Sequence, residues 1–405
     1  MTVPLMDWAR GKTDARAFLM WLYGAAGAGK SAIGYTLAKQ CEQQNYLLAT
    51  FFFSGIAPGR NSAKNLISTI AYQVARAIPD VQEYIHTSLT MNPMIFDESL
   101  QAQLFALIIH PLRQAQLQGF NFKGIPRLII IDGLDECRDN STQIQVVQAI
   151  SSSIRGSGLP LRFLIASRPE IHLQATFKSL TLQPHLCRLA LNDTFNADAD
   201  IRFFLVDSFR RIKAEHPLAH DIPTSWPSAQ VIDQLVRKSS GQFIYASTVV
   251  KYVAEFSQLP TRRLEVILGL QPHRGDKDMP FGELNALYMH ILSKLDDIER
   301  TLHVLGVLLI LNPFLGDLYN ITRIREVDNF LFWSYGETSV CLNQMASVIK
   351  CQADDTISFM HASLPDFLLD QSRSREFHIS QDSVLAFCTP ICLRHLRNSH
   401  QPGKP

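Results

Sequence analysis

The sequence has 405 residues, of which 46% are hydrophobic and 19% are charged, and its formal net charge is +1. A chain of this length can bury two or three cores, and its near-neutral charge provides no basic surplus to attract nucleic acid. Its longest apolar stretch, residues 304–311, is much shorter than the roughly 20 residues of a membrane-spanning helix. We therefore expect neither nucleic acid nor a membrane as a partner.

The cysteines and the N-terminal segment bear on the cellular location. The seven cysteines are odd in number and lack a metal-ligand spacing, which is typical of reduced thiols in the cytosol. Residues 1–16 are mixed and polar and do not have the apolar centre of a signal peptide. We expect a cytoplasmic protein.

An apolar run at residues 18–23 precedes the sequence GAAGAGKS, which begins at Gly24 and ends at Ser31. This is the phosphate-binding pattern G-x-x-x-x-G-K-[ST], between a predicted strand and a predicted helix. Glycines let successive backbone amides point at phosphate oxygens. Lys30 supplies a charge for the β and γ phosphates, and the Ser31 hydroxyl is a ligand for Mg²⁺. The sequence predicts a nucleoside di- or triphosphate site with Mg²⁺, formed by Gly24, Ala25, Ala26, Gly27, Ala28, Gly29, Lys30, Ser31 and Ala32.

Strands and helices alternate up to about residue 190, a pattern that predicts a parallel sheet covered by helices on both faces. Residues 47–53 form an apolar strand whose three phenylalanines we assign to the core. Ser62 is expected to cap a helix with one apolar face. A second helix is expected to bury one face formed by Leu100, Leu104, Leu107 and Ile108.

A cluster of carboxylates follows the β-branched run at residues 127–131. Ligands of open α/β sheets collect at the carboxyl ends of the strands, so Asp132 is placed to bind the Mg²⁺ of the phosphate loop. Asp135 and Glu136 lie within reach of a water molecule that attacks the γ phosphate. Either residue could be the catalytic base, and the sequence leaves the choice open.

Another predicted strand, residues 161–166, ends in Ser167, Arg168 and Pro169. The planar guanidinium of Arg168 suits a phosphoryl group and can stabilise charge that develops in the transition state. We therefore include Arg168 among the candidate catalytic residues. From Asp198 onward the pattern becomes helical, and the polar stretch 271–278 is predicted to be an exposed hinge.

These motifs resemble the NACHT division of the STAND nucleotide switches, and within it the fungal proteins with a nephrocystin-type NACHT module. The resemblance begins with WLYGAAGAGKSAI, IIIDGLDEC and IASRPE, which occur in the order of that family. Its later parts are GQFIYA from Gly241, LNALY from Leu284 and HASLPDFL from His361. The resemblance implies a P-loop NTPase core at 1–192, a helical subdomain at 193–275, a winged-helix-like subdomain at 276–380 and a C-terminal tail at 381–405.

The resemblance also implies a function. The family members are ATP/ADP switches with slow hydrolysis, which are closed with ADP and open on exchange for ATP. They then form homo-oligomers, or assemble with other STAND proteins, in NLR-like immune or programmed-death signalling. By position, Arg168 matches the family's first sensor, and His361 matches the histidine that contacts the β phosphate of bound ADP.

Two features differ from the family pattern. Gly55 stands where relatives commonly have a basic residue, and no 30- to 45-residue repeat of the kind in sensor arrays is found along the chain. A conventional P-loop ATPase and a truncated nucleotide-binding scaffold are therefore alternatives to the switch. The sequence does not decide between adenine and guanine.

Overall fold

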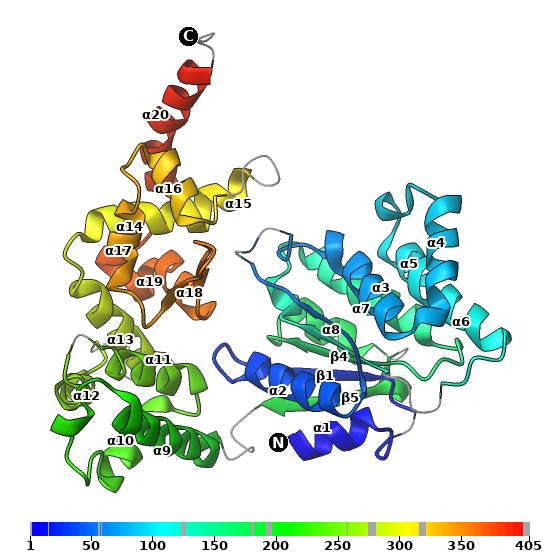
Figure 1. Cartoon of the computed structure of the whole chain (residues 1–405), viewed down its shortest axis with the longest axis horizontal. Helices are drawn as coiled ribbons and strands as arrows, with labels where there is room; N and C mark the ends of the chain where they lie inside the picture. The colour runs from blue at the N-terminus through cyan, green and yellow to red at the C-terminus, as the bar shows by residue number, and fades with distance from the viewer. Residues whose placement is uncertain are drawn as a thin grey trace. The chain divides into compact units, whose positions relative to one another are not determined.

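The chain forms two compact units, Met1–Asn192 and Asp193–Pro405 (Figure 1). This is a computed structural model, and it describes residues 2–14, 16–55, 57, 59–122, 127–179, 182–191, 197–256, 258–273, 281–315 and 321–399. Among the described helices, none is both long enough and apolar enough to cross a membrane.

The first unit is built on a five-stranded sheet in the order β2-β3-β4-β1-β5. All neighbouring strands are parallel, so their carboxyl ends lie along one edge, and β4 separates β1 from β3. The predicted α/β fold with a parallel sheet is confirmed. The strands are β1 (Leu19–Gly24), β2 (Leu47–Phe52), β3 (Leu128–Asp132), β4 (Arg162–Ser167) and β5 (Leu186–Leu191).

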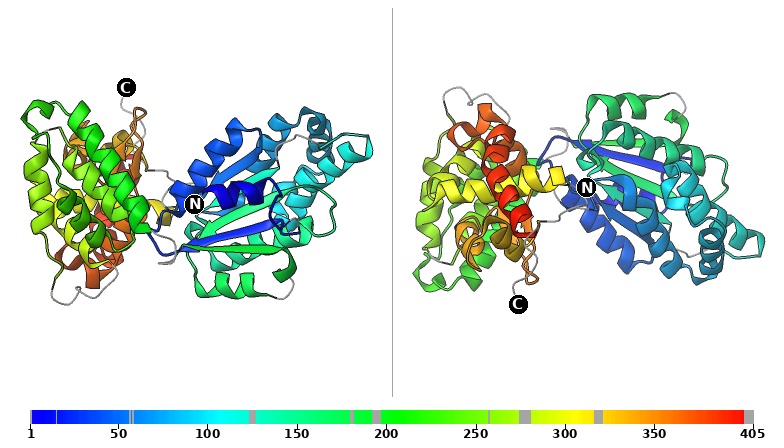
Figure 2. Two further views of the ribbon diagram at one scale, coloured as in Figure 1. Left: turned by 90° about the horizontal axis from the view of Figure 1, so that it is seen from below. Right: turned by 90° about the horizontal axis from the view of Figure 1, so that it is seen from above.

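Helices cover both faces of this sheet (Figure 2). Successive side chains of a strand point to opposite faces, and in β3 this places Leu128 and Ile130 in one core and Ile129 and Ile131 in the other. The first core also contains residues of α1 (Thr2–Ala9) and α2 (Lys30–Gln43). The second contains residues of α3 (Leu66–Ala77), α4 (Gln82–Met91), α5 (Leu100–Leu104), α6 (His110–Leu117), α7 (Asn140–Ile154) and α8 (Ile171–Lys178).

The structure refines three details of this unit. Phe51 and Phe53 lie in the core, as predicted, whereas Phe52 is only partly buried and belongs to neither core. Helix α3 begins at Leu66 after a short 3₁₀ turn, η1 (Ala63–Asn65), and the Ser62 hydroxyl makes no capping hydrogen bond there. The predicted second helix is interrupted between α5 and α6 by a π-helical turn, η4 (Phe105–Ile109), which regular α-helical spacing did not indicate.

The second unit is helical, with a two-stranded antiparallel hairpin of β6 (Ile349–Cys351) and β7 (Ile357–Phe359). Of the predicted hinge, residues 274–278 lie outside the described residues. Residues 381–399 of the segment predicted as a tail form helix α20 (Gln381–Ser399). The other helices are α9 (Ala197–Glu215), α10 (Ala229–Ser239), α11 (Phe243–Val253), α12 (Pro260–Gly269), α13 (Gly282–Ser293), α14 (Ile298–Gly306), α15 (Asn312–Leu315), α16 (Ile324–Leu331), α17 (Glu337–Asn343), α18 (Ser363–Leu369) and α19 (Gln371–Ser374), with a π turn, η8 (Val307–Leu311), after α14.

Helix α20 packs closely on α14 at Gly306, where an added Cβ would lie 2.6 Å from Cγ2 of Val384. Valine is stiff about χ1 and cannot easily move away. We expect Gly306→Ala to destabilise the second unit by about 1–3 kcal/mol through overpacking, measured by thermal unfolding. Gly269→Ala in α12 is the matched control, because no heavy atom lies within 4 Å of its added Cβ. Equal melting temperatures for the two variants would contradict this packing.

Candidate nucleotide-binding site

The Gly24–Ser31 loop connects the carboxyl end of β1 to the first turn of α2. Gly27 and Gly29 have φ values of 77° and 88°, in the left-handed region that glycine adopts without steric cost. Gly24 is required for a different reason, because a Cβ there would lie 2.9 Å from both the carbonyl oxygen and the Cβ of Leu191. The three glycines therefore permit a loop of the shape that the phosphate-binding pattern requires.

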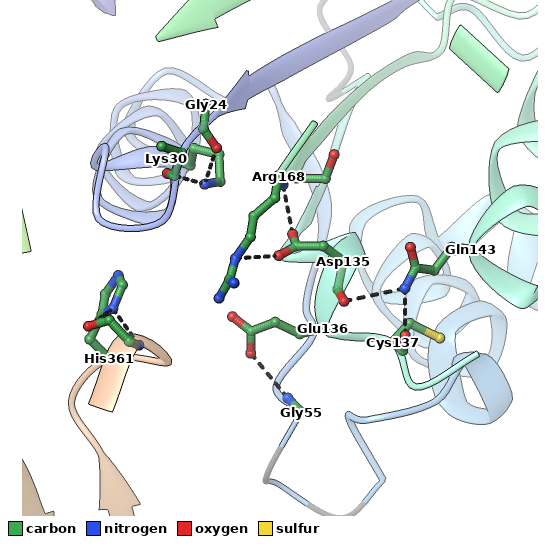
Figure 3. Close-up of polar contacts among 12 residues, drawn as sticks. Gly24, Lys30, Gly55, Asp135, Glu136, Cys137, Gln143, Arg168 and His361 are labelled. Carbon is green, nitrogen blue, oxygen red and sulfur yellow. Dashed lines mark hydrogen bonds and ion pairs between the residues drawn. The ribbon is translucent and has the colours of Figure 1, made fainter. Parts of the chain in front are cut away.

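Lys30 is the first residue of α2, and its ammonium lies against the loop. Its Nζ donates hydrogen bonds to the carbonyl oxygens of Gly24, at 2.8 Å, and Ala25, at 2.9 Å (Figure 3). Burial lowers the pKa of Lys30, and the nearby Asp135 carboxylate opposes that effect. The loop thus holds a partly desolvated cation, whose charge acts more strongly on an anion than it would in bulk water.

Asp132 is the last residue of β3 and is only 4% exposed. Its carboxylate accepts a hydrogen bond from the Ser31 side chain, and burial raises its pKa. Its Oδ1 atom is buried and has no hydrogen-bond partner among the described residues. Mg²⁺ prefers oxygen ligands of this kind, so a buried carboxylate with one unsatisfied oxygen beside a hydroxyl fits the predicted ion.

Replacing Asp132 by asparagine should separate metal binding from stability. We expect Asp132→Asn to lose most of the Mg²⁺ dependence of nucleotide binding, since a neutral amide is a poorer ligand than a carboxylate. Without nucleotide, the variant should be at least as stable as the wild type at neutral pH, because burial disfavours the charged carboxylate. Nucleotide titrations with Mg²⁺ and with EDTA, and thermal unfolding of the free chain, measure the two effects. Unchanged Mg²⁺ dependence would exclude Asp132 as a ligand.

Asp135 and Arg168 form an ion pair that joins the loop after β3 to the end of β4 (Figure 3). Asp135 Oδ2 lies 3.1 Å from Arg168 Nε, and Asp135 Oδ1 accepts a hydrogen bond from the Arg168 backbone N–H at 3.0 Å. The side chain of Asp135 is 7% exposed and that of Arg168 is 26% exposed. Both carboxylate oxygens of Asp135 are therefore engaged with Arg168.

Glu136 has different surroundings. Its Oε2 accepts a hydrogen bond from the backbone N–H of Gly55 at 3.1 Å (Figure 3). Burial raises the pKa of Glu136 to about 7, and the Gly55 hydrogen bond opposes the rise. A carboxylate with this pKa can take up a proton near neutral pH. In the sequence, Gly55 is notable only as a departure from the family pattern, and the contact that it makes with Glu136 uses its backbone N–H.

A family model described as Nephrocystin 3, N-terminal, matches residues 4–168. This range includes the phosphate-binding loop, the carboxylates after β3 and Arg168 at the end of β4. The first unit has the α/β fold of a P-loop NTPase domain, and over residues 4–168 it is similar to the N-terminal region of nephrocystin 3. The nephrocystin-type resemblance seen in the sequence motifs is confirmed over these residues. No curated protein matches the chain.

Solved structures of low sequence identity are also similar to the chain. A signal transduction ATPase with numerous domains (STAND) and a tetratricopeptide repeat sensor, from Pyrococcus horikoshii, shares 12% identity at a TM-score of 0.48, and the match covers 97% of this chain and 45% of that one. Drosophila ORC bound to DNA gives 14% identity, a TM-score of 0.41 and coverages of 90% and 91%. Cdc6p from Pyrobaculum aerophilum gives 11%, 0.37, and coverages of 97% and 93%. The chain spans less than half the length of the STAND protein.

The remaining predicted residue, His361, lies outside the P-loop NTPase domain, between β7 and α18 of the second unit. Its Nδ1 accepts a hydrogen bond from the Ser363 backbone N–H at 3.0 Å and lies 2.8 Å from the Ser363 Oγ. The Ser363 Oγ in turn lies 2.8 Å from the hydroxyl oxygen of Tyr288. Because Nδ1 accepts from a backbone amide, the neutral ring carries its proton on Nε2. That nitrogen is therefore a hydrogen-bond donor, as a contact to a phosphate requires.

Proposed function

We propose that the P-loop NTPase domain binds ATP or ADP with Mg²⁺ and hydrolyses ATP slowly. One observation carries this proposal. Strand β4 lies between β1 and β3, so the loop with Lys30, the carboxylates of Asp132 and Glu136, and Arg168 all lie at or just after the carboxyl ends of three adjacent strands. The carboxyl edge of an open α/β sheet is where such proteins bind their ligands.

Each residue has a distinct role in the proposed reaction. The backbone amides of the Gly24–Ser31 loop and the Lys30 ammonium bind the phosphates. Ser31 and Asp132 hold the cation, which when bound neutralises charge on the β and γ phosphates. Glu136 accepts the proton of the attacking water, because its carboxylate is not engaged by an arginine and its pKa is raised to about 7. Asp135 holds Arg168 beside the base, where the guanidinium can stabilise developing charge.

We further propose that the nucleotide operates a signalling switch. His361 contacts the β phosphate of ADP in the closed state, and exchange for ATP opens the chain and permits assembly with further copies or with other STAND proteins. Support for this step comes from the motif resemblance and from the fixed tautomer of His361. A coupling free energy of about 1–3 kcal/mol between nucleotide and domain closure would be ordinary for such a switch. NLR-like immune or death signalling in the cytoplasm is the corresponding biological role.

The alternative is a conventional P-loop ATPase that turns over rapidly. To distinguish the two, we would release and identify the nucleotide that co-purifies with the full chain, and then measure steady-state hydrolysis. Tightly held nucleoside diphosphate with slow turnover supports the switch. The nucleobase of the released nucleotide decides between adenine and guanine. An empty site with rapid turnover supports the conventional ATPase. A chain that retains no nucleotide and binds none on titration contradicts the proposal.

A further inference from the structure

Gln143 lies in the first turn of α7, where it is 2% exposed. Its Nε2 donates a hydrogen bond to the carbonyl oxygen of Cys137 at 2.7 Å and a longer one to that of Asp135 at 3.3 Å (Figure 3). These two carbonyls belong to the residues immediately before and after Glu136. The side-chain amide of Gln143 therefore holds the backbone on both sides of the proposed base.

The same amide reaches a third segment. Backbone carbonyls only accept hydrogen bonds, so the nitrogen of Gln143 must face them, and its Oε1 is left as an acceptor. That oxygen lies 2.7 Å from Nε2 of His172, which is then the donor. His172 belongs to α8, which closely follows Arg168 in the sequence. Gln143 is thus a second connection, beside the Asp135–Arg168 ion pair, between the loops that follow β3 and β4.

Packing alone does not account for glutamine at this position. The other residues that α7 buries are mostly apolar, and they include Val146, Val147 and Ile150. The start of the helix is capped independently by Asp139, whose side chain accepts from the backbone amides of Ser141 and Thr142. Burying an amide is unfavourable unless it is hydrogen-bonded, and here its hydrogen bonds go to the loop after β3 and to His172 of α8.

We propose that Gln143 is a positioning residue that holds Glu136 in register with Arg168. It fixes the backbone around Glu136 through two carbonyls and ties that backbone, through His172, to the segment that follows Arg168. This inference rests on the proposed function, in which Glu136 is the base. Gln143 acts on the base through the backbone carbonyls of Asp135 and Cys137.

The test compares Gln143→Leu with Gln148→Leu, which replaces an exposed glutamine on the same helix. Since small misplacements of catalytic groups are costly, we expect Gln143→Leu to lower kcat roughly ten- to hundredfold. Its dissociation constant for ADP should change by less than about threefold, because binding does not use the base. Hydrogen–deuterium exchange should become faster in the segment 134–139. The control should match the wild type in all three measurements.

The outcomes separate this inference from the proposed function. Unchanged exchange in segment 134–139 would overturn the positioning role, whatever the hydrolysis rate. Parallel losses of kcat, ADP binding and melting temperature would also overturn it, because they indicate a general structural role. If the wild type does not hydrolyse ATP, the proposed function fails, while faster exchange confined to this segment still supports the positioning role. His172→Phe is a second variant that leaves Gln143 in place, and it should show the same selective loss of kcat and faster exchange.

Discussion

Replacing Lys30 by alanine should weaken ADP and ATP binding about a hundredfold. The ammonium lies against the phosphate-binding loop, 2.8 Å from the carbonyl oxygen of Gly24, and it is the cation that the loop itself supplies. A charge-assisted hydrogen bond from an ammonium to a phosphate contributes about 3 kcal/mol, which is roughly a hundredfold in Kd. Titration calorimetry of the nucleotide-free chain with ADP and Mg²⁺ measures the change.

The matched control is Lys39→Ala, which removes an exposed lysine from the same helix. It changes the net charge equally and should bind ADP as the wild type does. The thermal unfolding of both free variants should be close to that of the wild type, which shows that lost binding is not lost folding. If Lys30→Ala and Lys39→Ala bind ADP with the same affinity, the Gly24–Ser31 loop is not the nucleotide site.

The sequence was sufficient to predict the strands that carry the candidate site. Strands of a parallel sheet are buried on both faces and therefore read as continuous apolar runs. This applies to residues 128–131 of β3 and 163–166 of β4, and every residue of these two strands is buried. The residues that follow these strands could be assigned to one edge of the sheet because the carboxyl ends of parallel strands share that edge.

The contacts between those residues could not be predicted, because they depend on strand order and on backbone groups. Asp135 pairs with Arg168, 33 residues further along the chain, only because β4 is a neighbour of β3. The hydrogen bond from Gly55 to Glu136 uses a backbone N–H, and no residue type indicates such a donor. These two contacts give Asp135 and Glu136 different surroundings, and this difference could not be predicted from the sequence.

The sequence does carry a signal that points to Gln143. The buried face of α7 includes residues 143, 146, 147, 150 and 154, which is regular helical spacing. A glutamine at the first of these positions is a polar residue on an otherwise apolar face. Since buried polar groups are almost always hydrogen-bonded, such a residue directly after an acidic loop is a candidate partner for that loop.

Replacing Glu136 by glutamine should abolish most hydrolysis and leave nucleotide binding intact. A positioned general base contributes about 10²–10⁴-fold to a rate, and glutamine can still accept the hydrogen bond from Gly55 but cannot take a proton. Wild-type kcat should rise with pH as Glu136 loses its proton near pH 7 and then level off. The residual rate of the variant should lack this rise. Phosphate release and ADP titration between pH 5.5 and 8.5 provide both measurements.

Glu136→Gln lowers hydrolysis, but it should raise the stability of the chain at high pH. This follows from the raised pKa of the Glu136 carboxyl group. Burial raises the pKa of Glu136 from 4.5 to about 7 in the folded chain, so the folded state binds this proton more tightly than the unfolded state does. The resulting stabilisation is complete below pH 4.5 and is lost as the pH rises through 7. Glu136→Gln should therefore melt close to the wild type at pH 5 and at a higher temperature than the wild type at pH 8.

Asp135→Asn provides the contrast, because it breaks the ion pair with Arg168 and leaves a guanidinium without its carboxylate. That variant should lose stability at both pH 5.5 and pH 8, along with hydrolysis, since removing one partner of a largely buried pair is destabilising. A stable Glu136→Gln that no longer hydrolyses ATP, beside a destabilised Asp135→Asn, identifies Glu136 as the base. If Glu136→Gln hydrolyses ATP at the wild-type rate, and Asp135→Asn folds normally but does not hydrolyse ATP, the roles of the two carboxylates are reversed.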